Sequence, residues 1–160
     1  MGFGRGNLDD ATMQALAQNG LRLEHPTHGY EGAVPTCEVT ALTPAQLADT
    51  DWVLVCVKAT ATRSVASSLA AALSSLPAGE GPLVLSLQNG VDNEAVLAAT
   101  LGAERVLGGL TRRIGAHIVN PGHVRATGPC ETILGHWPNT DRASSRPGVM
   151  ASITAVCTSI

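Results

Sequence analysis

The sequence has 160 residues, an apolar content of 44% and a formal net charge of −3 at pH 7. This composition suits a folded domain of ordinary size and argues against a nucleic-acid partner, because only 2% of the residues are aromatic and basic residues are few. No apolar run is long enough to cross a bilayer and no secretion signal opens the chain, so we expect a cytoplasmic protein with no membrane partner.

The four cysteines lack the CxxC or Cys/His spacing of zinc ligands. We therefore predict no metal site and interpret the cysteines as isolated thiols. Cys56 lies within an apolar run, where a buried, inert thiol is far more common than a nucleophile.

The first part of the chain predicts short elements. Apolar spacing over residues 10–19, followed by Gly20, indicates a helix that ends at the glycine. Residues 21–24 alternate as a half-buried strand does. The stretch of residues 25–35, rich in Gly, Pro and His, predicts a hairpin or surface loop before residues 37–41.

The signals are stronger from Thr43 onward. Thr43 followed by Pro44 predicts the start of a short helix over residues 45–48. The continuous apolar run of residues 52–57 predicts a strand covered on both faces, as in a parallel sheet. Helically spaced apolar residues follow it, at Val65, Leu69, Leu73 and Leu76.

A second buried strand is predicted at residues 83–87, followed by an Asn-Gly turn and a helix capped by Asp92 that runs toward Leu101. A third strand is predicted at residues 105–110. Three strands alternating with two helices form the βαβαβ pattern of a doubly wound α/β fold with a mostly parallel sheet. Short strands are then predicted at the antiparallel edge of this sheet, over residues 116–119, 123–127 and 131–134.

Two polar residues directly follow predicted strands, at the edge where open α/β sheets bind ligands. Lys58 follows the first of these strands and offers a cation for a carboxylate or phosphate. Asn89 follows the second and offers both a donor and an acceptor on a tight turn. By spacing alone, each is explained equally well as a solvated strand end or a turn-forming residue.

The opening glycines do not form the dinucleotide-binding motif GxGxxG. Asn7 stands where the last glycine is required, and no strand precedes Gly2. That motif works only when its glycines join a strand to a helix whose N-terminus faces the pyrophosphate. Another explanation is needed for this segment.

Several segments taken together resemble the ketopantoate reductase family. The combination of a VKA segment with a QNG turn is more specific than either alone, and the resemblance spans nearly the whole chain. The matching segments are CVKA at 56–59, LSLQNGVDNE at 85–94, GGLT at 108–111, GA at 115–116, NPGHV at 120–124 and ILG at 133–135.

The resemblance implies an NADP(H)-dependent oxidoreductase that reduces 2-dehydropantoate, a 2-keto acid, to pantoate in pantothenate and coenzyme A biosynthesis. It implies that Lys58 and Asn89 lie near the nicotinamide and the substrate, as cofactor-binding and auxiliary catalytic residues. It also assigns Arg5 to the 2′-phosphate of the cofactor, which a guanidinium suits through its paired donors, and Ile114 to the cofactor site. The resemblance is also compatible with a homodimer.

The resemblance further implies an incomplete chain. Residues 1–138 are expected to form an NADP-binding, Rossmann-like domain without the family's first βα unit. That absent strand belongs at the centre of a 3-2-1-4 sheet. Residues 139–160 are expected to be a loop and the start of a helix leading to the family's C-terminal helical domain. Because that domain supplies the general-acid lysine, we expect little activity from the isolated chain.

Two alternatives remain open. The first alternative is a non-catalytic remnant, or a nucleotide-binding fragment that needs a partner chain to supply the missing strand. The second is a related 2-hydroxy-acid or 6-phosphogluconate-type dehydrogenase. Titration with NADPH tests the first alternative, and the substrate specificity of a full-length version tests the second.

Overall fold

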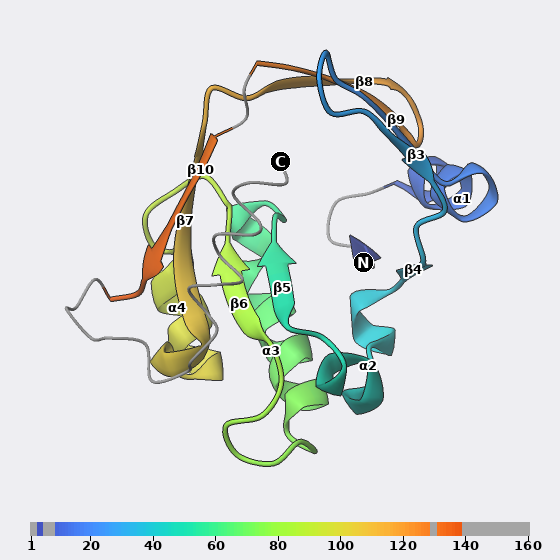
Figure 1. The fold of residues 1–160 in the computed structure, drawn as a ribbon. Coiled ribbons are helices and arrows are strands. Elements are labelled where there is room, and N and C mark those ends of the chain that lie inside the picture. The colour runs from blue at the N-terminus through green and yellow to red at the C-terminus, as the bar shows by residue number, and fades with distance from the viewer. Residues whose placement is uncertain (1–2, 5–8, 129–130, 139–160) are drawn as a thin grey trace.

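Three parallel strands form the centre of the fold in the computed structural model, which describes residues 3–4, 9–128 and 131–138 (Figure 1). Strands β5 (Trp52–Val55), β6 (Leu83–Ser86) and β7 (Val106–Arg112) pair in that order. Strand β10 (Glu131–His136) pairs antiparallel with β7 and forms the far edge. The predicted parallel sheet with an antiparallel edge is thus confirmed.

Two helices connect these strands and cover one face of the sheet. Helix α3 (Thr62–Leu73) joins β5 to β6, and α4 (Asn93–Leu101) joins β6 to β7. Helix α3 begins and ends earlier than its apolar spacing suggests, and α4 begins after Asp92 without a capping bond from that side chain. No helix within the described ranges is long and apolar enough to span a membrane.

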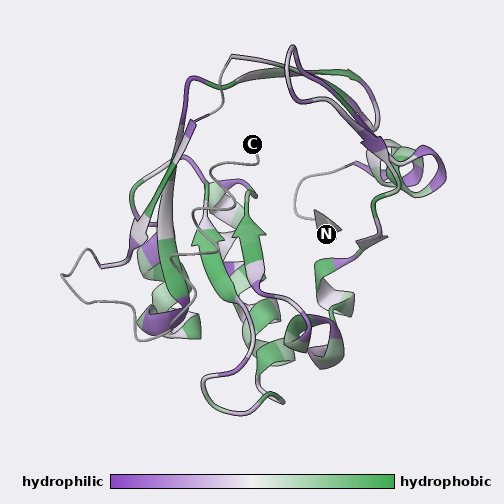
Figure 2. Ribbon diagram, in the orientation of Figure 1, coloured by the Kyte–Doolittle hydropathy of each residue, from purple (hydrophilic) through white to green (hydrophobic). Residues whose placement is uncertain are grey.

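The main core lies between the sheet and these two helices, where apolar residues concentrate on the central strands and on α3 (Figure 2). The apolar spacing of α3 predicted this packing, because residues three and four apart share one face of a helix. The buried members of this core are Leu47, Val55, Val65, Ala66, Leu69, Ala72, Val84, Leu97, Leu101 and Val106. A smaller cluster on the opposite face contains Leu83, Leu85 and Leu107.

Strand β5 is an edge strand among the described residues, which agrees with the predicted lack of the family's central strand. No described strand pairs with its free edge, since β1 (Phe3–Gly4) pairs in parallel with β4 (Thr36–Cys37) as a separate sheet. In Figure 1, β1 lies on the side of β5 opposite β6. One face of β5 is not covered as predicted: Leu54 is exposed, and so is Cys56 just beyond the strand.

A second four-stranded sheet contains residues predicted to complete the edge of the first. Its order is β3-β2-β9-β8, with the strands β2 (Leu21–Glu24), β3 (Tyr30–Gly32), β8 (Gly115–Asn120) and β9 (His123–Thr127). The prediction was wrong for β8 and β9, because β9 finds its parallel partner in β2, about a hundred residues away in the chain. Helix α1 (Asp10–Asn19) precedes β2 and ends at Gly20, as predicted.

The segment between β3 and β5 is largely helical. After the short β4, residues Val39–Ala41 form the 3-10 helix η1. Helix α2 (Pro44–Ala48) begins as predicted, with a reciprocal capping box between Thr43 and Gln46. Two further 3-10 turns, η2 (Ala59–Ala61) and η3 (Ala103–Arg105), precede α3 and β7.

Leu97 offers a test of this core. It is 0% exposed between α4 and the sheet, so Leu97→Ala should lower the free energy of unfolding by about 2–5 kcal/mol. Leu110 on β7 is 61% exposed, so Leu110→Ala is the matched control and should change that energy by less than about 0.5 kcal/mol. Equal losses for the two variants in urea unfolding would contradict the assignment of the core.

Candidate functional site

Two loops lie side by side beyond the carboxyl ends of β5 and β6. The Leu87 amide donates to the Val55 carbonyl at 3.0 Å, which continues the pairing past the end of β6. The loop after β5 carries Lys58 and the loop after β6 carries Asn89; both residues are exposed. The structure thus brings two of the predicted site residues to neighbouring loops at one edge of the sheet.

A buried polar network joins these loops. The Gln88 side chain donates from Nε2 to the Val57 carbonyl and to Thr62 Oγ1, each at 2.8 Å. Thr62 Oγ1 in turn donates to Asn93 Oδ1 at 3.0 Å, and Asn93 Nδ2 donates to the Asn89 carbonyl at 3.0 Å. The bonds run continuously from the carbonyl before Lys58 to the carbonyl of Asn89.

The network also joins the starts of two helices. Thr62 is the first residue of α3 and Asn93 is the first residue of α4, so their hydrogen bond holds the helices together where the loops enter them. The turn before α4 requires a glycine at Gly90, where φ is 116°. The sequence indicates Gln88 only as part of the QNG turn and indicates no role for Thr62 or Asn93, because hydrogen bonds between separate loops leave no periodic signal.

The other two predicted cofactor residues are placed differently. Arg5 lies outside the described residues. Ile114 is exposed and lies just after β7. Strand β7 is longer than β6: its pairing with β6 ends at Gly108, opposite Ser86, and the strand itself continues to Arg112. Ile114 therefore lies beyond the same edge of the sheet as the two loops, in the connection between β7 and β8.

At this connection, one carboxylate forms ion pairs with two guanidinium groups. Glu131 accepts from Arg112 Nε at 2.6 Å and from Arg113 Nη1 at 2.8 Å. These contacts lower the pKa of Glu131 below its usual value, and the hydrogen bond from Arg112 is the largest cause. Arg113 has a φ of 57°, an unfavourable conformation for a residue with a side chain, so the two ion pairs stabilise a strained turn beside Ile114.

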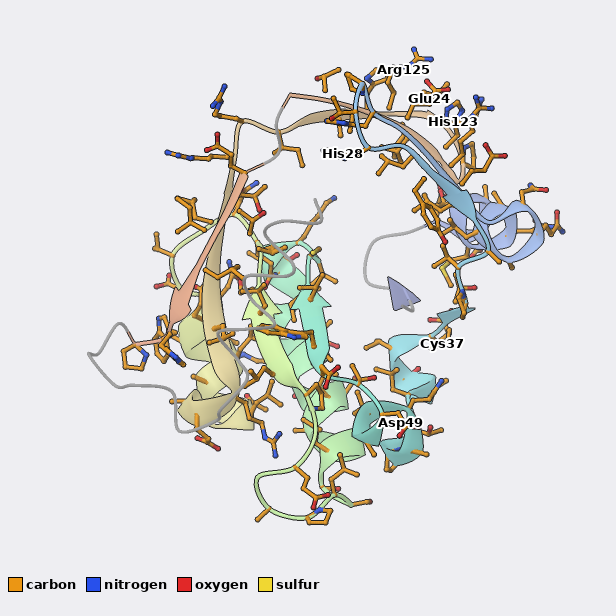
Figure 3. All side chains as sticks on the ribbon, in the orientation of Figure 1. Glu24, His28, Cys37, Asp49, His123 and Arg125 are labelled. Carbon is orange, nitrogen blue, oxygen red and sulfur yellow. The ribbon has the colours of Figure 1, made fainter. Side chains whose placement is uncertain are left out.

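A second charged cluster ties β2 to β9. Glu24 accepts from Arg125 Nε at 2.7 Å and contacts His123 Nε2 at 2.9 Å, and the three side chains gather at the second sheet (Figure 3). The bond from Arg125 is the main cause that lowers the pKa of Glu24. The sequence analysis missed this cluster, because its members come from distant parts of the chain.

Cys56 is exposed, contrary to the buried thiol predicted from its apolar surroundings. The atoms packed around it still remove water from the sulfur, and this desolvation raises the pKa of the thiol. A raised pKa disfavours the reactive thiolate, so the prediction of an unreactive cysteine keeps a physical basis. Within the described ranges, no group of three or more His, Cys, Asp or Glu side chains is placed to hold a metal ion.

The chain is similar to a known protein family and to individual members of it. The profile of the family "Ketopantoate reductase PanE/ApbA" matches residues 8–139. The chain is 37% identical over 128 residues to the 2-dehydropantoate 2-reductase of Halobacterium salinarum, covering 80% of this chain and 39% of the relative. It is 40% identical over 135 residues to the enzyme of the same name from Archaeoglobus fulgidus, covering 84% of this chain and 42% of the relative.

The fold is also similar to that of a solved structure. The 2-dehydropantoate 2-reductase of Geobacter metallireducens is 28% identical and superposes with a TM-score of 0.73, covering 99% of this chain and 46% of that one. The chain therefore spans less than half the length of each of these relatives.

The Glu131 ion pairs generate a pH prediction. The folded-state pKa of Glu131 lies below the usual 4.5, so its stabilisation is complete above 4.5 and is lost as the pH falls through the lower, folded-state value. Replacing Glu131 with Gln should therefore make the melting temperature less sensitive to acid over that window. Glu80→Gln, in an exposed loop, is the control for removing a carboxylate. A Glu131→Gln variant with the wild-type acid sensitivity would refute the assignment.

Proposed function

The chain belongs to the ketopantoate reductase family, and we propose that the protein uses NADPH to reduce 2-dehydropantoate, a 2-keto acid, to pantoate. The observation that carries this proposal is the placement of Lys58 and Asn89 in adjacent loops at the carboxyl edge of a parallel sheet, within the part of the chain that matches the family. Since the chain spans 39% and 42% of its curated relatives, the reaction is proposed for the whole protein.

The residues at this edge fit a nicotinamide cofactor and a 2-keto acid. Gln88 Oε1 is buried and accepts no hydrogen bond from the described residues, which makes it an acceptor suited to an amide donor. The Lys58 ammonium suits a carboxylate, and the Asn89 amide suits a carbonyl or hydroxyl group. When bound, the reduced nicotinamide supplies a hydride to the keto carbon.

In this proposal, the two loops orient the reacting groups rather than donate the proton. Lys58 binds the anionic end of the substrate, and Asn89 positions the cofactor and the substrate relative to each other. Adjacent loops suit this task because both ligands must meet at one edge of the sheet. Arg5 binds the 2′-phosphate, and Ile114 contacts the cofactor from the end of β7.

Asn89 gives a direct test in the full-length protein. Asn89→Ala should lower kcat/KM for 2-dehydropantoate by about tenfold or more, the scale of losing one positioned hydrogen bond near the reacting atoms. Turnover is followed by NADPH oxidation, with Asn120→Ala, at the hairpin between β8 and β9, as the control. No NADPH-dependent turnover of 2-dehydropantoate by the unmodified protein would refute the proposed reaction. Unchanged turnover in Asn89→Ala would leave Asn89 as a turn residue only.

Arg5 gives a test of cofactor choice. A guanidinium that pairs with the 2′-phosphate favours NADPH over NADH, so Arg5→Ala should reduce the ratio of the two affinities by about tenfold. The affinities are measured by the fluorescence of each reduced cofactor. Arg22→Ala, in the second sheet, removes a guanidinium elsewhere and should leave the ratio unchanged. Equal affinities for both cofactors in the unmodified protein would remove Arg5 from the site.

A further inference from the structure

The strongest unassigned feature is the buried network of Thr62, Gln88 and Asn93. We propose that these three are positioning residues, which set the placement of Lys58 relative to Asn89 and thereby the affinity for ligands that contact both loops. The ligand part of this inference rests on the proposed function. The coupling between the two loops rests on the hydrogen bonds alone.

Burial makes these hydrogen bonds matter. Thr62 is 1% exposed, Gln88 is 9% exposed and Asn93 is 5% exposed. Water cannot readily replace a bond lost there, so a broken contact leaves a buried polar atom without a partner. The loops are therefore expected to shift rather than tolerate the loss.

The direction of each bond identifies Thr62 as the central group. Both bonds from Gln88 use its amide nitrogen, so Gln88 acts as the donor toward the first loop. The Thr62 hydroxyl accepts from Gln88 and donates to Asn93, a double role that only a hydroxyl fulfils here. Removing that hydroxyl breaks two bonds at once, to Gln88 and to Asn93, and leaves the bond from Gln88 to the Val57 carbonyl as the remaining link between the loops.

The attachment points lie beside the exposed residues rather than on their side chains. Gln88 binds the Val57 carbonyl, one residue before Lys58, and Asn93 binds the carbonyl of Asn89 itself. The network thus fixes the backbone from which each of the two side chains projects. A shift of about 1 Å in such a backbone is enough to reduce the fit to a bound ligand strongly.

The sequence allows each loop to be observed separately. Lys58 is the only lysine among these 160 residues, so reductive methylation of this chain with 13C-formaldehyde adds one side-chain NMR signal besides that of the α-amino group. Backbone 15N signals report on Asn89 and Gly90. The variants are Thr62→Val, which removes the hydroxyl at nearly constant shape, Thr62→Ser, which keeps it, and Asn93→Asp, which replaces the donor to Asn89 with a carboxylate oxygen and adds a negative charge. Thr100→Val, on the exposed face of α4, is the matched control.

We expect Thr62→Val to displace the Lys58 signal and the Asn89 signal together and to weaken NADPH binding by about tenfold. Thr62→Ser should return both signals and the affinity to within about twofold of the wild type, a rescue that loss of core packing would not show. Asn93→Asp should displace the Asn89 signal and leave the Lys58 signal in place. Thr100→Val should change neither signal.

The proposal is overturned if Thr62→Val leaves the Asn89 signal in place, or if Thr62→Ser fails to restore it. Should Thr62→Val not fold, Asn93→Asp decides: an unmoved Asn89 signal overturns the proposal and a displaced one supports it. If the unmodified chain binds no NADPH, the proposed cofactor role fails, while the NMR signals still decide whether the network couples the two loops.

Discussion

The parallel pairing of β5 with β6 is the constraint on which the candidate site depends. It brings the carboxyl ends of both strands to one edge, and the bond from the Leu87 amide to the Val55 carbonyl carries the pairing into the loops. Helices α3 and α4 then start next to each other, which allows Thr62 to reach Asn93. Without this parallel ladder, the polar residues that follow the two strands would have no common edge to share.

The sheet is asymmetric around this pair. On one side, β6 is fully buried between β5 and β7, and its ladder continues to β10. On the other side, β5 has a free edge in the described structure, with Leu54 and Cys56 exposed. Unpaired backbone groups and exposed apolar side chains at an edge favour addition of another strand, so this side is where a further strand would stabilise the fold.

The second sheet depends on one strained connection. The chain passes from β7 to β8 through Arg113, whose positive φ turns it away from the first sheet, and Glu131 pairs with Arg113 and with the neighbouring Arg112. Glu24 and Arg125 hold the other end, between β2 and β9. Two carboxylates thus stabilise an extended arm that has little apolar core of its own.

The βαβαβ unit can be predicted from the sequence, because apolar runs and helical spacing are local signals that agree with the packing. The sequence also placed Lys58 and Asn89 at strand ends, where a resemblance to known reductases supplied candidate roles. The pairing of β9 with β2 and the bond by which Gln88 joins the two loops at the Val57 carbonyl are visible only in the tertiary structure. The reason is physical: these contacts join residues far apart in the chain, and no periodicity records which distant partner a strand edge or a buried amide will find.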